Sequence, residues 1–414
     1  MTSPWMASPA VRILAGLVLG LIAGTALIGA SLGSAIAPVA AQVGRLWLDA
    51  LTMTVVPLVF ALLVSGVMRA AEQASAGRTA ATAIVWFAIL LVAASLLGAV
   101  VTPLMLDLYP LPRAAALLPQ TVGDMPPVPV ATDWLNNIIP TNPIKAAAET
   151  AMVPIVIFAL LFGLAASGIE AEPRLAIERL FEGIAQAMLR IVRWVLVIAP
   201  LGVFALAFGV GATLGGSAAG VLAHYVFIVV VTALASILLV YVAAVTFGRS
   251  GPIAFALSAL PAQAIAVSTQ SSLASLPAMV ATAPRLHVRP EVAGIVLPLA
   301  VSLFRVTSAA ANVAVAVYLA SVHGVPLTPT TLMLGAIVAA AVSVAAVGLP
   351  AQISFFAIIA PVCIAMGVPV TLLPLLLAIE TLPDVFRTLG NVTGDLAVTR
   401  IVGAESRNGS EKLV

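Results

Sequence analysis

The chain has 414 residues, of which hydrophobic types make up 62% and charged types only 8%, whereas charged residues form about a quarter of an ordinary soluble domain. This composition excludes a soluble globular protein and predicts an all-α, polytopic membrane protein. The net charge of +2 gives no sign of a nucleic-acid partner, and the single cysteine, Cys363, cannot form an internal disulfide.

Apolar segments long enough to cross about 30 Å of hydrocarbon, which takes about 20 helical residues, recur along the chain. They are continuous rather than alternating, which favours helices over barrel strands. We expect spans near residues 11–34, 46–68, 80–105, 151–168, 186–212, 221–247, 290–320 and 371–403. The first apolar run is too long for a signal peptide, so we interpret it as a retained helix.

Basic residues near helix ends favour the cytoplasmic side of a membrane. If both termini are cytoplasmic, most of the 18 basic residues lie inside, and only Arg45, Arg113 and Lys145 lie outside. Arg305 and Arg387 then fall within spans. This arrangement predicts an integral protein of a bacterial-type inner (plasma) membrane with cytoplasmic N- and C-termini.

Two hydrophobic segments in the C-terminal half are interrupted. Residues 252–283 contain the polar sequence TQSSLASLP at 269–277, and residues 331–366 contain the break AAVGLPAQ at 345–352. We expect two re-entrant hairpins, because successive interrupted segments are typical of a transporter whose binding site lies at the midplane of the membrane. The alternative is a pair of helices that proline kinks for packing.

The last span carries five polar residues at helical spacing. Glu380, Asp384, Arg387, Asn391 and Asp395 follow one another at intervals of four, three, four and four, so a helix places them in one stripe. An ionisable group at the membrane centre costs several kcal/mol. The stripe must therefore face protein, water or ligand, and the alternative to a functional site is a set of ion pairs that hold helices together.

These residues resemble a known family, the glutamate transporter family of dicarboxylate/amino acid:cation symporters. DVFRTLGNVTGD at 384–395 resembles its last-helix signature, and TQSSLASLP resembles its first hairpin. PTNPIKAAAE at 140–149 and LTMTVVPLVFALLVSGV at 51–67 resemble its fourth and second helices. The resemblance implies eight transmembrane helices, two re-entrant hairpins and a homotrimer in the lipid bilayer.

The resemblance also implies two kinds of domain, a trimerisation scaffold and a transport domain that moves like an elevator. The expected division is 1–78 (scaffold helices 1 and 2), 79–106 (transport helix 3), 107–215 (outer loop and scaffold helices 4 and 5), 216–405 (the remaining transport domain) and 406–414 (a cytoplasmic tail).

The family implies that Arg387 binds the side-chain carboxylate of the substrate and that Asp384 receives its α-amino group. A guanidinium offers a planar fork to a carboxylate, and a carboxylate one turn away can pair with an ammonium. The remaining expected substrate contacts are Thr388, Asn391, Ser308 and the hairpin tips near Ser271, Ser272 and Gly348.

An acidic amino acid, aspartate or glutamate, uses all of these groups at once, so it is the preferred substrate. The alternative is a C4-dicarboxylate carried with sodium or protons, although its second carboxylate would face Asp384. A neutral substrate would leave Arg387 buried and unpaired.

The sequence departs from the family where relatives bind sodium. Phe304, Arg305 and Val306 replace the Asn-Met-Asp part of a seventh-helix motif, and Leu90 and Leu91 stand where sodium-binding members have hydroxyl residues. We therefore expect transport without sodium, either proton-coupled or uncoupled.

Three residues are candidates for coupling. Arg305 would act as a tethered cation beside Asp395, or alternatively snorkel or cap a broken helix. Glu380 would carry a proton, or alternatively be a paired structural acid. Asn391 and Asp395 remain as a possible residual cation site. The sequence contains no His or Cys cluster with metal-ligand spacing and no cofactor motif.

Two other function classes fit the sequence less well than transport does. Asp384 and Asp395 suggest an aspartyl hydrolase, but eleven residues of helix separate them by about 16 Å, too far to share a proton. Two gate-like hairpins are more typical of a transporter with alternating access than of a channel. The sequence therefore predicts a transporter rather than an enzyme.

Overall fold

The computed structural model describes the whole chain apart from residues 1–8, 29, 76, 118–138, 346–350 and 412–414. In the described part every regular element is a helix, which confirms the expected all-α fold. Five helical stretches in this part are long and apolar enough to cross a membrane, at 31–75, 78–108, 199–246, 252–269 and 290–323.

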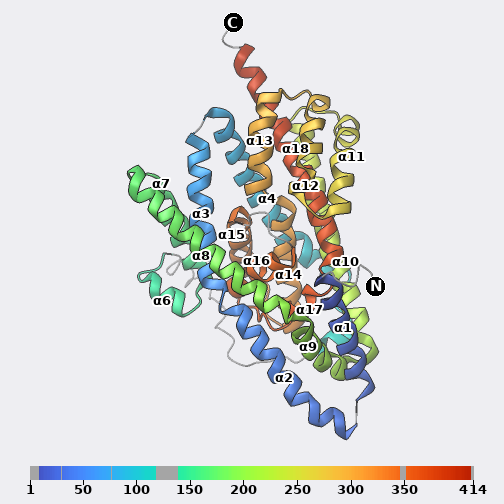
Figure 1. The fold of residues 1–414 in the computed structure, drawn as a ribbon. Coiled ribbons are helices and arrows are strands. Elements are labelled where there is room, and N and C mark those ends of the chain that lie inside the picture. Colours follow the sequence, from blue (N-terminus) through green and yellow to red (C-terminus); the bar gives the residue numbers. More distant parts are fainter. Residues whose placement is uncertain (1–8, 29, 76, 118–138, 346–350, 412–414) are drawn as a thin grey trace, which may run out of the picture.

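Figure 1 labels the helices in chain order. They are α1 (Pro9–Ala26), α2 (Ser31–Thr52), α3 (Val55–Ser75), α4 (Arg78–Leu108), α6 (Pro143–Ala148), α7 (Met152–Ser167), α8 (Ala171–Val197), α9 (Ala199–Leu214), α10 (Ala218–Thr246), α11 (Pro252–Thr269), α12 (Ser272–Thr282), α13 (Pro290–Leu303), α14 (Val306–His323), α15 (Pro329–Ala345), α16 (Ala351–Ala365), α17 (Leu373–Leu377) and α18 (Thr381–Glu411).

Several expected spans are divided in the structure. The expected helix at 11–34 was wrong, because α1 ends at Ala26 and α2 begins at Ser31. The span at 46–68 covers the junction of α2 with α3, and the span at 186–212 covers the junction of α8 with α9. Pro57 and Pro200 follow these two junctions, and proline lacks the N–H that would continue the preceding helix.

Helix α1 packs closely on α9. Gly16, Gly20 and Gly24 lie one turn apart on α1, and a Cβ atom at any of them would collide with backbone carbonyl groups of α9. Small residues at this spacing let two helix backbones approach in a membrane, where van der Waals packing replaces the hydrophobic drive. On the neighbouring helices, the Trp47 indole N–H of α2 donates to the Val195 carbonyl of α8 at 3.0 Å.

Two helix breaks shape the C-terminal half. Between α11 and α12, Gln270 is left-handed with φ of 52°, and the Ser271 hydroxyl accepts from the Ala274 amide at 3.2 Å to cap α12. Phe304 and Arg305 leave the helical conformation between α13 and α14. The expected break between α15 and α16 lies outside the described residues.

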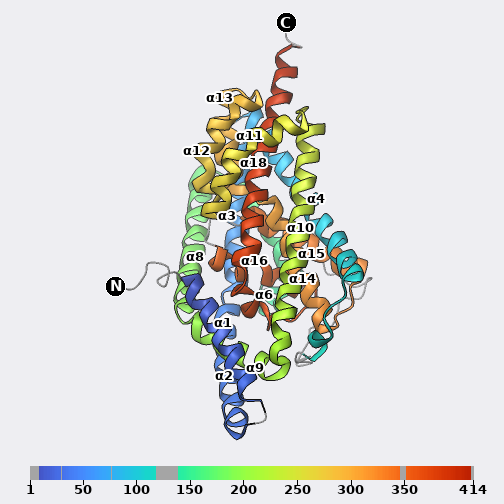
Figure 2. The ribbon, with the colours of Figure 1, turned by 90° about the vertical axis from the view of Figure 1, so that its right-hand side faces the viewer.

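Helix α18 packs against most of the other helices of the C-terminal half, from α10 to α14. It runs beside α11, α12 and α13 toward the C-terminus, with α2 at the opposite end of the molecule (Figures 1 and 2). Gly390 and Gly394 let it approach the start of α14, because a Cβ on Gly390 would collide with the Thr307 side chain and one on Gly394 would lie 2.6 Å from Val306 Cγ1. The break between α13 and α14 is therefore held against the polar stripe of α18.

Candidate functional site

The polar stripe of α18 faces the protein interior. Arg387, Asn391 and Asp395 are 6%, 2% and 0% exposed, and Asp384 is partly buried. Glu380, 2% exposed, lies one residue before the helix, where its carbonyl accepts the Asp384 amide at 2.9 Å. The predicted spacing therefore produces one buried stripe whose first member is the N-terminal cap.

Two side chains hold the guanidinium of Arg387. Its Nε atom lies 2.8 Å from Oε1 of Glu380 in an ion pair. Its Nη1 atom donates to Oδ1 of Asn312 on α14 at 2.7 Å. The Nη2 atom is buried and has no hydrogen-bond partner among the described residues. Glu380 and Asn312 thus orient the guanidinium through Nε and Nη1, and Nη2 remains a donor without an acceptor among the described residues.

Glu380 is also bound through its second oxygen. The Tyr225 hydroxyl of α10 donates to Oε2 of Glu380 at 3.2 Å. The Tyr225 ring meets the Tyr318 ring edge to face at 5.3 Å, and the Tyr318 hydroxyl lies 3.3 Å from Nδ1 of His224. The carboxylate paired with Arg387 is therefore fixed by a polar cluster between α10 and α14.

Asn391 joins α18 to the first turn of α14. Its Oδ1 atom accepts from the backbone amides of Thr307 at 3.0 Å and Ser308 at 3.3 Å, and its Nδ2 atom donates to the Ser308 hydroxyl at 3.0 Å. The first amides of a helix have no partners within the helix. Asn391 and Ser308, both predicted to be site residues, thus meet and stabilise the end of the broken helix.

Arg305 lies at the break, where it interacts electrostatically with Asp395 and Asp384. Both carboxylate oxygens of Asp395 are buried, and neither has a hydrogen-bond partner within the part of the chain that the structure describes. A buried, uncompensated carboxylate costs several kcal/mol, so the nearby guanidinium charge stabilises it. With Glu380 and Arg387, the group contains three carboxylates and two guanidinium groups.

The neighbouring space is filled by apolar groups. The ring of Phe304 stacks on Phe87 of α4 with centroids 4.8 Å apart. Leu90 and Leu91 are 4% and 1% exposed and belong to the same hydrophobic cluster as these rings. These four side chains supply no oxygen ligand, whereas hard cations such as sodium need several.

The other predicted contacts vary in position. Ser272 and Thr388 are buried, while Ser271 caps α12 as described. Gly348 lies outside the described residues. Of the groups that contact Arg387 and Glu380, sequence reasoning missed Asn312 and Tyr225. Asn312 carried a usable signal, because it is an amide within the otherwise apolar run 309–320.

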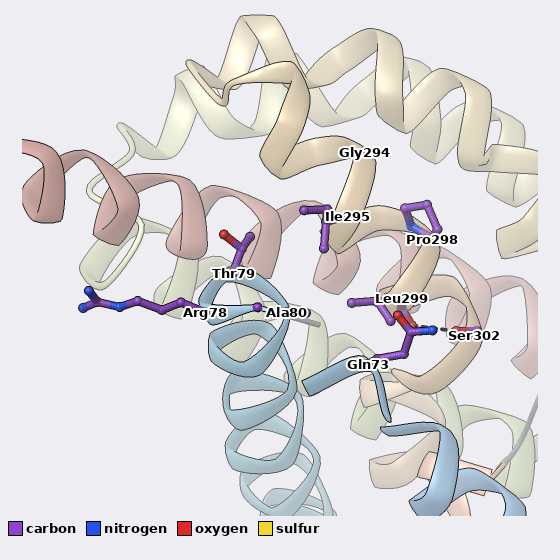
Figure 3. A pocket seen from close by; sticks show the side chains of 10 residues that line it. Gln73, Arg78, Thr79, Ala80, Gly294, Ile295, Pro298, Leu299 and Ser302 are labelled. Atoms are coloured by element: carbon purple, nitrogen blue, oxygen red, sulfur yellow. Dashed lines mark hydrogen bonds between the residues drawn. The ribbon is translucent and has the colours of Figure 1, made fainter. Parts of the chain in front are cut away.

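A cavity of about 530 Å³ lies elsewhere, between the ends of α3 and α4 and the face of α13 (Figure 3). Its lining includes Gln73, Thr79, Pro298 and Ser302, while the Arg78 side chain extends away from it. None of the described stripe residues lines this cavity, so it is separate from the candidate site.

Comparison with known proteins places the chain in a family. A family model described as the sodium:dicarboxylate symporter family matches residues 10–405. The C4-dicarboxylate transport protein of Azorhizobium caulinodans is 26% identical over 410 residues, which cover 95% of this chain and 87% of the relative. The proton/sodium-glutamate symport protein of Bacillus subtilis is 27% identical over 403 residues, 93% of this chain and 90% of the relative.

The proton/glutamate-aspartate symporter of Escherichia coli is 25% identical over 373 residues, 87% of this chain and 83% of the relative. The resemblance seen in the helix motifs is thereby confirmed, as is the expectation that the protein is not an enzyme. The chain belongs to the sodium:dicarboxylate symporter family and is an integral membrane transporter.

Proposed function

We propose that the protein carries an acidic amino acid, aspartate or glutamate, across a bacterial inner membrane without requiring sodium. The observation that carries this proposal is the placement of Arg387 and Asp384 one turn apart on α18, within a stripe that faces the protein interior. Arg387 would bind the side-chain carboxylate and Asp384 the α-amino group. Thr388, Asn391, Ser308 and the tips near Ser271, Ser272 and Gly348 would complete the site.

A C4-dicarboxylate is the second candidate, because relatives such as the Azorhizobium protein carry that name. Arg387 suits either ligand, so Asp384 is the group that distinguishes them. A second carboxylate placed beside Asp384 would be repelled by about 4 kcal/mol at 4 Å and an effective dielectric of 20. This repulsion favours the amino acid unless Asp384 takes up a proton.

Sodium independence is supported by the packing around the helix break. Phe304, Phe87, Leu90 and Leu91 fill the space beside α4, and Arg305 places a positive charge next to Asp395. Arg305 would serve as a tethered cation, and Asn391 with Asp395 would be at most a residual cation site. Glu380 is the proposed proton carrier, since a proton on Glu380 would release Arg387 for the substrate.

The movement is proposed to be that of an elevator within a homotrimer. In the described part, α1, α2, α3, α7, α8 and α9 pack on one another, as a scaffold would. Helix α18 packs against α10, α11, α13 and α14, as a transport unit would. The proposed boundaries remain 1–78, 79–106, 107–215, 216–405 and 406–414.

Uptake of radiolabelled aspartate, glutamate and succinate into proteoliposomes tests the proposal, with sodium and proton gradients imposed separately. We expect aspartate or glutamate to accumulate without sodium. Preferential accumulation of succinate would favour the dicarboxylate alternative. Arg387→Cys should abolish aspartate binding and can admit a neutral amino acid, so an undiminished affinity of this variant for aspartate in calorimetry would contradict the assignment of Arg387.

A further inference from the structure

Asn312 has a buried side-chain amide, and only one of its two polar atoms has a hydrogen-bond partner in the described part of the chain. Its Oδ1 atom accepts from Nη1 of Arg387 at 2.7 Å, while its Nδ2 atom is buried without a hydrogen-bond partner in the described part of the chain. Arginine is a donor only, so the atom of Asn312 that faces it must be the oxygen. The donor-only guanidinium therefore fixes the orientation of the amide, and Nδ2 is the donor without a partner among the described residues.

The guanidinium has the same kind of unused donor. Nη1 faces Asn312, Nε faces Glu380, and Nη2 is buried with no partner among the residues that the structure describes. A buried donor that lacks an acceptor costs about 1–3 kcal/mol in general. Two such donors on neighbouring side chains indicate an acceptor that the described part of the protein does not supply.

The two unused donors are close enough to share one ligand group. The oxygen and nitrogen of an amide, like two nitrogens of a guanidinium, lie about 2.3 Å apart by standard bond lengths. With the 2.7 Å contact between Oδ1 and Nη1, Nδ2 and Nη2 can be at most about 7 Å apart. A carboxylate whose oxygens each accept a bond of about 2.9 Å spans up to about 8 Å.

We propose that Asn312 is a specificity-determining residue, whose Nδ2 atom and Arg387 Nη2 together bind the side-chain carboxylate of the substrate. The inference rests on the proposed function and adds a second, uncharged donor to the acidic-substrate site. Because both nitrogens donate and cannot accept, a carboxylate satisfies them and a side-chain amide satisfies them less well. Asn312 would thus help to reject asparagine and glutamine.

The test is calorimetric binding of aspartate, asparagine and succinate to the detergent-solubilised full chain. Asn312→Asp keeps an oxygen for Arg387 Nη1 and replaces the Nδ2 donor with an acceptor. We expect the affinities for aspartate and succinate to fall by about 10- to 100-fold, which is the loss that removal of a hydrogen bond to a charged group predicts. The ratio of aspartate to asparagine affinity should fall at least 10-fold.

Asn142→Asp is the matched control. Asn142 caps α6 through its Oδ1 atom, which an aspartate retains, so this variant should bind like the wild type. Asn312→Ala is measured beside Asn312→Asp, because it removes the Nδ2 donor without adding a negative charge next to Arg387. The same fall in the affinity ratio is expected for it, and size-exclusion chromatography checks that both variants fold.

The selectivity ratio separates this role from a structural one, which would weaken acid and amide ligands equally. An unchanged ratio in both variants, with a wild type that binds aspartate or succinate, would overturn the inference alone. A wild type that binds none of the acids would overturn the proposed substrate class and the inference with it.

Discussion

Replacing Glu380 with glutamine should strengthen the binding of anionic substrates. Glu380→Gln removes the negative charge that faces Nε of Arg387 at 2.8 Å. Its amide oxygen can face Nε while its amide nitrogen donates to the Tyr225 hydroxyl, which in the wild type bonds the second oxygen of Glu380. With the charge centres about 4 Å apart and an effective dielectric of 20, the ion pair amounts to about 4 kcal/mol. The substrate carboxylate would then meet an arginine whose charge is no longer compensated.

This energy sets an upper limit of about 1,000-fold on the gain in affinity, since 1.4 kcal/mol corresponds to a factor of ten. The gain should be largest at pH values at which Glu380 of the wild type is ionised, and it should vanish where Glu380 is protonated. If the proton on Glu380 couples to transport, the variant should still exchange aspartate but should lose uptake driven by a proton gradient.

The assay is calorimetric titration of aspartate between pH 5 and 9, combined with counterflow and gradient-driven uptake in proteoliposomes. Glu291→Gln, which removes a carboxylate from the first turn of α13, is the control for loss of charge outside the site. Unchanged affinity and unchanged pH dependence in Glu380→Gln would refute both the competition with substrate and the proton-carrying role.

Further predictions concern selectivity, coupling, packing and assembly. Asp384→Asn should weaken aspartate by at least 10-fold more than succinate in the same titrations, and equal losses would indicate a structural role for Asp384. Wild-type binding should be the same in choline and sodium buffers, whereas Arg305→Met should acquire sodium sensitivity; a steep sodium dependence of the wild type would contradict the proposal. Gly390→Ala should lower the free energy of unfolding by about 1–3 kcal/mol, because the new Cβ would collide with Thr307. Gly183→Ala should leave it unchanged, since Gly183 has open space around it. Native mass spectrometry in mild detergent should show a homotrimer, and an active monomer would argue against it.

The sequence by itself determined the fold class and the position of the polar stripe. Long apolar runs have to be helical in a membrane, because backbone groups find no water there. The helical period then places Arg387, Asn391 and Asp395 on one face, whatever surrounds them. Four segments, including DVFRTLGNVTGD, also indicated the family, and the family model that matches residues 10–405 confirmed it.

Helix boundaries and contact partners required the tertiary structure. Pro57 and Pro200 did not reveal whether each segment would form one bent helix or two separate helices, because packing against neighbouring helices decides between these outcomes. The roles of Asn312 and Tyr225 were equally hidden. Asn312 lies 75 residues before Arg387 and Tyr225 lies 155 residues before Glu380, and only the packing of α10 and α14 against α18 brings these pairs together. A sequence pattern records periodicity along one helix, whereas a binding site depends on which faces of separate helices meet.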